Sequence, residues 1–460
     1  MKMKNSNKQR QEGNVMLVAL MVTAVLGVSL ASYLVMVGTQ NRSVYRSQNW
    51  NNAIAVTEAG VEEGLSHLNA VNTVPDDLAS NGWTSQGGGV YACPRRYLGS
   101  NYYDVKITVT TNRAKPYVDC VGTVALVGPF ASAPQTMFAA AGVTTQEPKS
   151  LARKVEVMTR TDGLLTVVMA AIQQIDFSGN NVKTDSFDST DPNYSTNGKY
   201  DSTKTRDHGD VCTDYTITNS FSIGNADIKG IVRTGANGTA TIGANGSVGD
   251  KNWVDSGKTG IQAGHFFDDF NVSFPPVKLP AGASLWLPPT PYVGPQIGGV
   301  SYSYVLNGGS WKLSQLNGSV LVTGPAKLYV TDRIALSGQS QIRIANTNNA
   351  SLLMYVGAPT ASISGNGVVN ESNVAINFQY LGLPSNTSLG FGANSAFFGC
   401  IYAPSAVFTL GGGGNNTMDF IGASVSYSVK MNGHYNFHYD ESLMSSGPSR
   451  GYIVTSWREL

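Results

Sequence analysis

The chain has 460 residues and a formal net charge of +1, so its charge gives no reason to expect a nucleic-acid-binding protein. Charged residues make up 13% of the chain, against about 25% in a typical globular protein. Hydrophobic residues make up 42%, which is enough to build folded cores and excludes a disordered chain. Low charge with abundant glycine, asparagine, serine and threonine is typical of an extracellular, turn-rich β protein.

The first predicted element is a long helix that starts with a charge-free segment. Val15–Gly38 is almost wholly apolar, and about 20 apolar residues suffice to cross a bilayer as a helix. Further along, apolar residues recur at steps of three, four and seven, which is one face of an amphipathic helix. These residues are Trp50, Ile54, Val61, Leu65 and Leu68. We therefore predict one helix over residues 14–70, with a transmembrane half and an amphipathic half.

The residues before this helix predict its orientation. The leader, residues 1–13, carries Lys2, Lys4, Lys8 and Arg10 against Glu12, and basic flanks favour the cytoplasmic side. A secretory signal peptide would have a shorter apolar core followed by a small-residue cleavage site, whereas Gly38 is followed by Thr-Gln-Asn-Arg. Two interpretations remain open at this point. Either the apolar segment is a plain transmembrane anchor, or the leader before it is removed by cleavage after Gly13.

A basic leader that ends in Gly13 directly before the apolar run resembles the prepilin leader of type IV pilins and pseudopilins. The segment NAIAVTEAGVEEGLSHL is also similar to the second half of the helix in PilX-type minor pilins. The resemblance implies cleavage after Gly13 by a prepilin peptidase, with Asn14 as the new N-terminus. It also implies other pilin or pseudopilin subunits as partners. The fifth mature residue is usually glutamate in major pilins and is Val18 here, a departure that many minor subunits share.

Residues 71–165 are predicted to form a small β-rich head of the kind a pilin has. Apolar and polar residues alternate over Tyr103–Thr110, which predicts a half-buried strand. The segments YVDCVGTVALV and RKVEVMTR predict two more strands, which gives an α+β head. Cys93 and Cys120 lie in this one short segment, and we predict a disulfide between them if the chain is exported. The four cysteines have no metal-site spacing.

Residues 166–445 are predicted to form a large all-β domain. Short apolar couplets such as Val320/Val322 and Ile342/Ile344 are separated by turn residues, so each couplet faces one side of a strand. This pattern favours a β-solenoid, specifically a right-handed β-helix, although the spacing also allows a β-sandwich. A proline-rich interruption near residues 273–295 predicts an extended connector. Residues 446–460 are predicted to be a C-terminal tail.

Several phrases in this region resemble an uncharacterised solenoid-like domain that follows PilX-type helices in envelope proteins of environmental bacteria. They include LYVTDRIALSG, GCIYAPSAVFTLGGGG, DFIGASVSYSVKMNG and HYDESL. The resemblance covers most of residues 174–443. It implies no activity for this chain.

Three groups of residues are candidates for chemistry. Seven acidic residues in the segment 185–214 could bind calcium through carboxylate oxygens, but their spacing matches no calcium motif, and a solvated polar loop is the alternative. They are Asp185, Asp188, Asp191, Asp201, Asp207, Asp210 and Asp214. His434 and His438 would share a metal on a helix but lie about 13 Å apart on a strand. The aromatic alternation around them favours a strand, so we interpret His434, His438, Asp440 and Glu441 as capping the solenoid end.

Catalytic residues are not evident in the regular part of the solenoid. Its acids, Asp332, Glu371 and Asp419, are far apart in sequence, whereas glycosidases of this fold need paired carboxylates. We therefore predict a chain without catalytic, metal or cofactor residues. The prediction is a pilin-like subunit of a type IV pilus or secretion pseudopilus, anchored in the cell envelope, whose solenoid contacts surface glycans or proteins. The alternatives are a carbohydrate-binding or carbohydrate-active protein on a pilin-like anchor, and a surface protein that never enters a filament.

Overall fold

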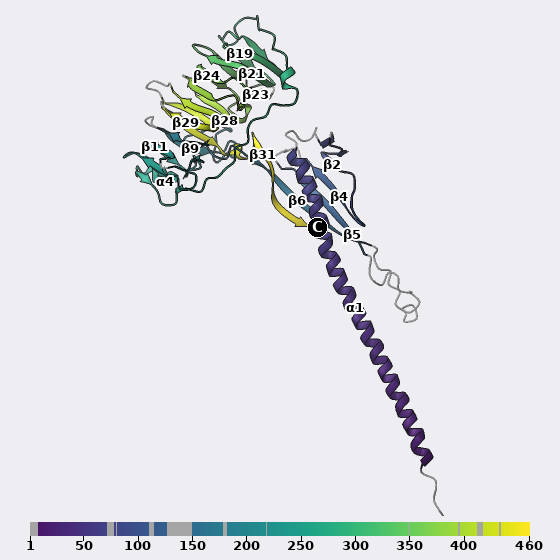
Figure 1. Ribbon diagram of the computed structural model, residues 1–460. Coiled ribbons are helices and arrows are strands. Elements are labelled where there is room, and N and C mark those ends of the chain that lie inside the picture. The colour runs from purple at the N-terminus through teal and green to yellow at the C-terminus, as the bar shows by residue number, and fades with distance from the viewer. Residues whose placement is uncertain are drawn as a thin grey trace, which may run out of the picture. The chain divides into compact units, whose positions relative to one another are not determined.

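The computed structural model describes residues 8–70, 78–79, 81–109, 115–126, 150–177, 182–217, 219–347, 349–393, 396–411, 417–431 and 434–460. These residues divide into two compact units (Figure 1). The first comprises residues 1–160 together with 452–460, and the second comprises residues 161–451. The leader residues Lys2 and Lys4 lie outside the described residues.

The first unit is built on one uninterrupted helix, α1, which runs from Lys8 to Ala70. Its apolar half is exposed throughout, from Val15 at 69% to Met36 at 50% of the side-chain surface. This half is long and apolar enough to cross a membrane. The second half buries Ala53, Val56 and Val61 against a sheet. The predicted long helix with an apolar and an amphipathic half is therefore confirmed, except that Trp50, expected on the apolar face, is 45% exposed.

The sheet of the first unit is antiparallel among its first strands and has the order β1-β2-β4-β5-β6-β31, with β3 beside β4. Its strands are β1 (Thr84–Gly87), β2 (Val90–Ala92), β3 (Arg96–Leu98), β4 (Asn101–Thr108), β5 (Tyr117–Ala125), β6 (Ser150–Gly163) and β31 (Ser449–Glu459). The three strands predicted from alternation are β4, β5 and β6. Residues 446–460 were expected to form a tail, and this was wrong, because β31 adds an edge strand to the head sheet.

Glycines allow α1 to approach this sheet closely. A Cβ at Gly60 would lie 2.4 Å from the Cys120 Sγ, and one at Gly64 would lie 2.7 Å from a Val118 methyl group. On the sheet side, a Cβ at Gly122 would lie 2.3 Å from the Thr57 hydroxyl and 2.9 Å from the Ala53 carbonyl oxygen. Both surfaces therefore need a hydrogen in place of a side chain where they meet.

The structure does not join Cys93 and Cys120, which corrects the prediction of a disulfide between them. Both are buried free thiols. The Cys93 amide bonds to Val105 and the Cys120 position pairs with Val105, so the two cysteines flank β4 from opposite sides. Two strand spacings amount to about 9.6 Å, and disulfides need Cα atoms within about 7 Å. Burial raises the pKa of the Cys120 thiol to about 12, which keeps it protonated.

The second unit contains the large mostly-β region that the sequence predicts. Its elements up to the connector are β7 (Met169–Ala171), β8 (Ile175–Asp176), β9 (Lys183–Phe187), β10 (Val211–Thr213), β11 (Phe221–Gly224), β12 (Asp227–Lys229), β13 (Val232–Arg233), β14 (Ala240–Ile242), β15 (Ser247–Gly249), α4 (Lys251–Asp255), β16 (Gly260–Ile261) and β17 (Phe266–Phe267). After the connector, which holds the 3₁₀ turn η1 (Ala283–Leu285), come β18 (Tyr304–Leu306), β19 (Gly309–Leu316), β20 (Val320–Val322), β21 (Pro325–Leu336), β22 (Gln341–Ile344), β23 (Ser351–Val356), β24 (Thr360–Gly365), β25 (Gly367–Asn370), η2 (Ala375–Asn377), β26 (Phe378–Gly382), β27 (Ser388–Ala393), β28 (Phe397–Leu410), β29 (Met418–Met431), β30 (Tyr435–Asp440) and η3 (Glu441–Ser445).

The strands of this unit pair in parallel with strands from the preceding and the following turn of the chain. Met169–Ala171 pairs with Val211–Thr213, and Val211 pairs in turn with Val232. The same holds after the connector, where β21 pairs with β23, β23 with β26 and β26 with β28. The long strand β21 pairs with both β23 and β24, and the long strand β28 pairs with both β26 and β27. These pairings close a six-stranded parallel ring, β21-β23-β26-β28-β27-β24.

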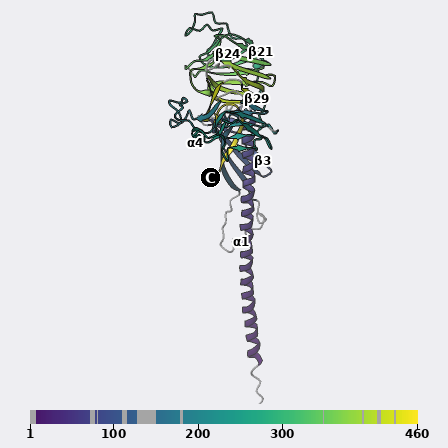
Figure 2. The same cartoon turned by 90° about the vertical axis from the view of Figure 1, so that its left-hand side faces the viewer.

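The first strands of this unit lie in its middle. Strands β7, β8 and β9 pair on one side with β10, β11 and β12, and on the other side with β29 and β30. Figures 1 and 2 both show β21 and β24 on one side of β29 and α4 on the other. The chain therefore winds outward from β7, passes through the proline-rich connector, and winds back until β29 and β30 meet β7–β9. We call this junction the seam.

A continuous series of contacting phenylalanines fills the core across the seam. The Phe397 and Phe420 ring centroids are 4.5 Å apart, those of Phe420 and Phe437 are 5.2 Å apart, and those of Phe437 and Phe177 are 6.4 Å apart. A further contact of 5.2 Å joins Phe177 to Phe221. All five side chains are essentially inaccessible to solvent. One apolar core thus continues from the late strands into the early ones.

We predict that Gly122→Ala loosens the head, because the new methyl group would meet backbone atoms of α1 that cannot turn aside. Overpacking of this kind costs about 1–3 kcal/mol. The measurement is the rate at which a thiol reagent modifies Cys120 in the detergent-solubilised full chain, followed by peptide mapping. Gly38→Ala is the matched control, since nothing lies within 4 Å of a Cβ there. Equal labelling rates in wild type and Gly122→Ala would contradict the tight contact.

Candidate functional site

A polar cleft of about 680 Å³ lies beside the seam. One wall is the loop that contains Thr196, Asn197 and residues 199–202. The other wall consists of Asp419 from β29 and of Asn436 and His438 from β30. A volume of this size is within the range of small-molecule sites, about 300–1,000 Å³.

Asparagine and aspartate side chains shape the loop wall. Thr196 and Lys199 exchange two backbone hydrogen bonds of 3.0 Å around Asn197 and Gly198. Those two residues have φ angles of 54° and 75°, which is why an Asn-Gly pair forms this tight hairpin turn. The Asp201 carboxylate accepts bonds from the Thr203 amide at 2.9 Å and from the Thr196 hydroxyl at 2.6 Å. These bonds hold the pKa of Asp201 at about 2.

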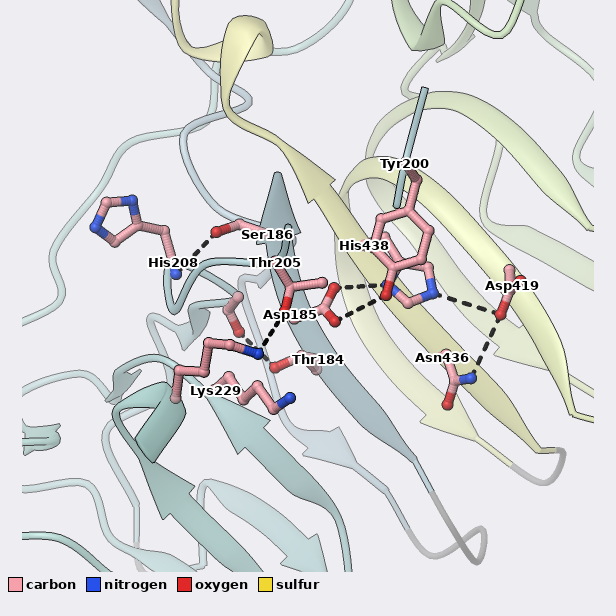
Figure 3. Close-up of polar contacts among 12 residues, drawn as sticks. Thr184, Asp185, Ser186, Tyr200, Thr205, His208, Lys229, Asp419, Asn436 and His438 are labelled. Carbon is pink, nitrogen blue, oxygen red and sulfur yellow. Dashed lines mark hydrogen bonds and ion pairs between the residues drawn. The ribbon is translucent and has the colours of Figure 1, made fainter. Parts of the chain in front are cut away.

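The floor of the cleft is a buried histidine between two carboxylates (Figure 3). His438 is 4% exposed. Its Nδ1 lies 2.6 Å from Asp185 Oδ1, and its Nε2 lies 3.4 Å from Asp419 Oδ1. The Tyr200 hydroxyl donates to Asp185 Oδ2 at 3.0 Å, and the Tyr200 ring lies over the imidazole at a centroid distance of 3.8 Å. Asn436 donates to the same Asp419 oxygen at 3.4 Å.

This geometry favours a protonated imidazole. Burial opposes the charge on His438, but the bonds to Asp185 and Asp419 outweigh burial and raise the pKa of His438. The hydrogen bond from His438 in turn lowers the pKa of Asp419. Burial and the neighbouring Asp185 charge raise the pKa of Tyr200 well above its usual value, so its hydroxyl stays a donor. An imidazolium is the one form of this side chain that donates to both carboxylates at once.

A second cluster anchors the base of the loop to the end of β30. Glu441 accepts bonds from the Ser186 hydroxyl at 2.8 Å and from Arg206 at 2.8 Å, and its carboxylate lies 3.0 Å from His208 Nδ1. The contact with Glu441 raises the pKa of His208. Residues 186, 206 and 208 are thereby fixed to a residue that lies more than two hundred positions later in the chain.

The acidic side chains of residues 185–214, considered as calcium ligands, have separate partners in the structure. Asp188 and Asp191 accept bonds from amides two residues ahead, as in turns. Asp210 is largely buried and accepts from the Ile231 amide at 2.7 Å. Asp185 faces His438 instead. Within the described residues, no group of three acidic, histidine or cysteine side chains is arranged to hold a metal ion.

The segment His434–Glu441 is a strand where the sequence predicts one, but its expected position was wrong. Residues 435–440 form β30, which has β29 on one side and β9 on the other, so it lies inside the stack and does not cap an end. Of the three acids considered for catalysis, only Asp419 lines the cleft. Glu371 instead accepts a bond from Arg343 at 2.9 Å.

The Asp185–His438 contact could not be predicted from the sequence, because 253 residues separate the two. Tyr200 was also missed, although its loop contains the Asn-Gly hairpin signal. The residues predicted for processing, Gly13 and Asn14, lie within α1, and Val18 is 58% exposed on the same helix.

Comparisons with known proteins found a family match and similar solved structures. Residues 315–446 match a family described as a domain of unknown function (DUF7305). Among solved structures, the crystal structure of competence-associated pilin ComZ from Thermus thermophilus aligns with 89% of this chain and 96% of its own chain. That alignment has 11% sequence identity and a TM-score of 0.23. The search of curated proteins found no match.

We predict that the second unit loses stability as pH rises above about 6.5. A group whose pKa is raised by folding stabilises the folded state fully below its unfolded pKa, about 6.5 for histidine. That stabilisation is lost as pH rises through the folded pKa. Thermal unfolding of the full chain, followed in detergent between pH 5.5 and 8.5, should show this decline.

The contribution of each histidine can be separated by substitution. His438→Gln should flatten most of the decline, because it removes the more buried of the two raised groups. His208→Gln is the control for the second raised histidine. In a variant that carries both substitutions, an unchanged loss of stability with rising pH would show that neither imidazole causes that loss.

Proposed function

We propose that this chain is a pilin-like, non-catalytic subunit of a type IV pilus or related secretion pseudopilus in the cell envelope. The observation that carries the proposal is the first unit. A helix with an exposed apolar half of bilayer length continues, without a break, into a half that packs on an antiparallel sheet. The pilin-like leader ending at Gly13 supports the same assignment. The resemblance to PilX-type subunits and the prepilin peptidase as processing enzyme are part of the proposal.

We further propose that the second unit is a β-solenoid with two arms that meet at the seam. Parallel pairing between successive chain returns and a continuous apolar core support this interpretation. The closed ring is a local departure from a simple β-helix, because β21 and β28 are each long enough to pair with two successive strands of the neighbouring turn. In this view the solenoid is the outward part of the subunit and contacts surface ligands. The alternative function is an envelope-anchored carbohydrate-active protein. The observation that favours it is the position of Asp419 in the cleft.

The proposal predicts processing between Gly13 and Asn14. Mass spectrometry of the membrane-extracted protein should find Asn14 as the first residue. Gly13→Val should retain the basic leader, whereas Gly27→Ala, in the apolar half where a Cβ meets nothing within 4 Å, should be processed normally. A mature chain that starts at Met1 or near Thr39 would remove the pilin-like assignment.

The proposal also predicts a low copy number at the filament tip or at initiation. In a pilus the carboxylate at the fifth position neutralises the ammonium of a neighbouring subunit. Val18 supplies no carboxylate, and an unpaired charge in an apolar core costs several kcal/mol. Such a cost is avoided where no subunit precedes this one. Quantitative proteomics of sheared filaments should find the chain far below the major subunit, with Val18→Ala unchanged and Val18→Glu enriched. Stoichiometry near that of the major subunit would contradict a tip position.

A further inference from the structure

The cleft at the seam presents hydrogen-bonding groups on both walls. The Asp419 side chain is 47% exposed, and its bonds to His438 and Asn436 both end on Oδ1. Its other oxygen, Oδ2, therefore remains for a ligand that donates. Across the cleft, Asn197 and Lys199 are exposed at the tip of the hairpin turn and can donate to a ligand. Donors and acceptors thus face one space from three separate segments of the chain.

The charges in this space favour a neutral ligand. Asp419 and Asp201 stand against His438 and Lys199, so an anion such as phosphate would meet two carboxylates. A cation would find one unbonded carboxylate oxygen, Asp419 Oδ2, because both oxygens of Asp201 already accept bonds from Thr196 and Thr203. Hydroxyl groups donate and accept at once and match mixed walls of this kind. We propose that the cleft binds a neutral, hydroxyl-rich ligand, a short stretch of glycan.

His438 is a positioning residue in this site. Both of its ring nitrogens are bonded to carboxylates, so it has no donor left for a ligand, but its two bonds orient Asp419 and tie the opposite wall to the strands through Asp185 and Tyr200. Both walls are therefore held apart at a fixed spacing before a ligand arrives, which reduces the ordering cost of binding. The neutral imidazole can donate to only one of the two carboxylates, so binding should weaken when His438 loses its proton.

This inference deepens the proposed function, because it names the kind of ligand that an outward solenoid would contact. The two are tested separately. Binding is measured on the purified full chain in detergent, and filament assembly plays no part in it. A chain that never enters a filament can still bind a glycan, and a true filament subunit can fail to bind one.

The experiment titrates the full chain with cellotriose, maltotriose, laminaritriose and N-acetylated chitotriose by calorimetry. At least one should bind saturably, and Asp419→Ala and Asn436→Ala should each weaken that binding at least tenfold. Lys199→Gln, on an exposed loop, is a second variant that keeps the test valid if Asp419→Ala fails to fold. Asp332→Ala, exposed on β21 and outside the cleft, is the matched control and should bind like wild type.

The positioning role has its own readout. Wild-type affinity for the bound trisaccharide should fall as pH rises from 6 to 8.5, and His438→Gln should remove that pH dependence. The proposal is overturned if no trisaccharide binds saturably, or if Asp419→Ala and Lys199→Gln both bind as tightly as wild type. Tighter binding of inorganic phosphate or spermidine than of any trisaccharide would equally overturn it.

Discussion

Parallel pairing of the earliest and latest strands of the second unit is the constraint on which the rest of this unit depends. β30 pairs with β9 over five positions, from Asn436↔Lys183 to Asp440↔Phe187. Without this pairing, both arms would end in unpaired strand edges next to each other, and such edges are costly to leave open. Phe437 against Phe177 seals the same junction from inside. The seam thus turns two separate windings into one stack.

The polar site exists because of this junction. Asp185 and His438 are directly opposed in the pairing of β9 with β30, and β29 brings Asp419 to the other edge of the imidazole. A buried ion pair is weak evidence for stability in itself, since desolvation offsets much of the attraction. Its geometric effect is clearer. It joins two strands that lie 253 residues apart in the sequence, and Asp185 and His438 together hold Tyr200 of the loop.

Much of the first unit could be predicted from the sequence, because its signals are local and long. The apolar run and the amphipathic spacing of Val61 and Leu68 fix α1, and simple alternation fixes β4. Strand β31 could not be predicted, because its residues are exposed on both faces and show no alternation of burial. The disulfide prediction failed for a related reason. Proximity in sequence says nothing of the strand that separates Cys93 from Cys120. In the second unit, couplets predict strands, but only the folded chain reveals that β9 and β30 are neighbours.

The chain enters the second unit through β6 and leaves it through β31, and these strands are neighbours in one sheet. A load applied to the inserted region therefore reaches the head at Gly163 and Ser449, the adjoining ends of both strands. From there it runs along β6, whose pairing with β5 extends from Tyr117↔Met158 to Ala125↔Ser150. Hydrogen bonds perpendicular to a pulling force share it simultaneously, whereas bonds that are peeled from one end break in turn. A pull along β6 would therefore load its hydrogen bonds to β5 together and not one after another.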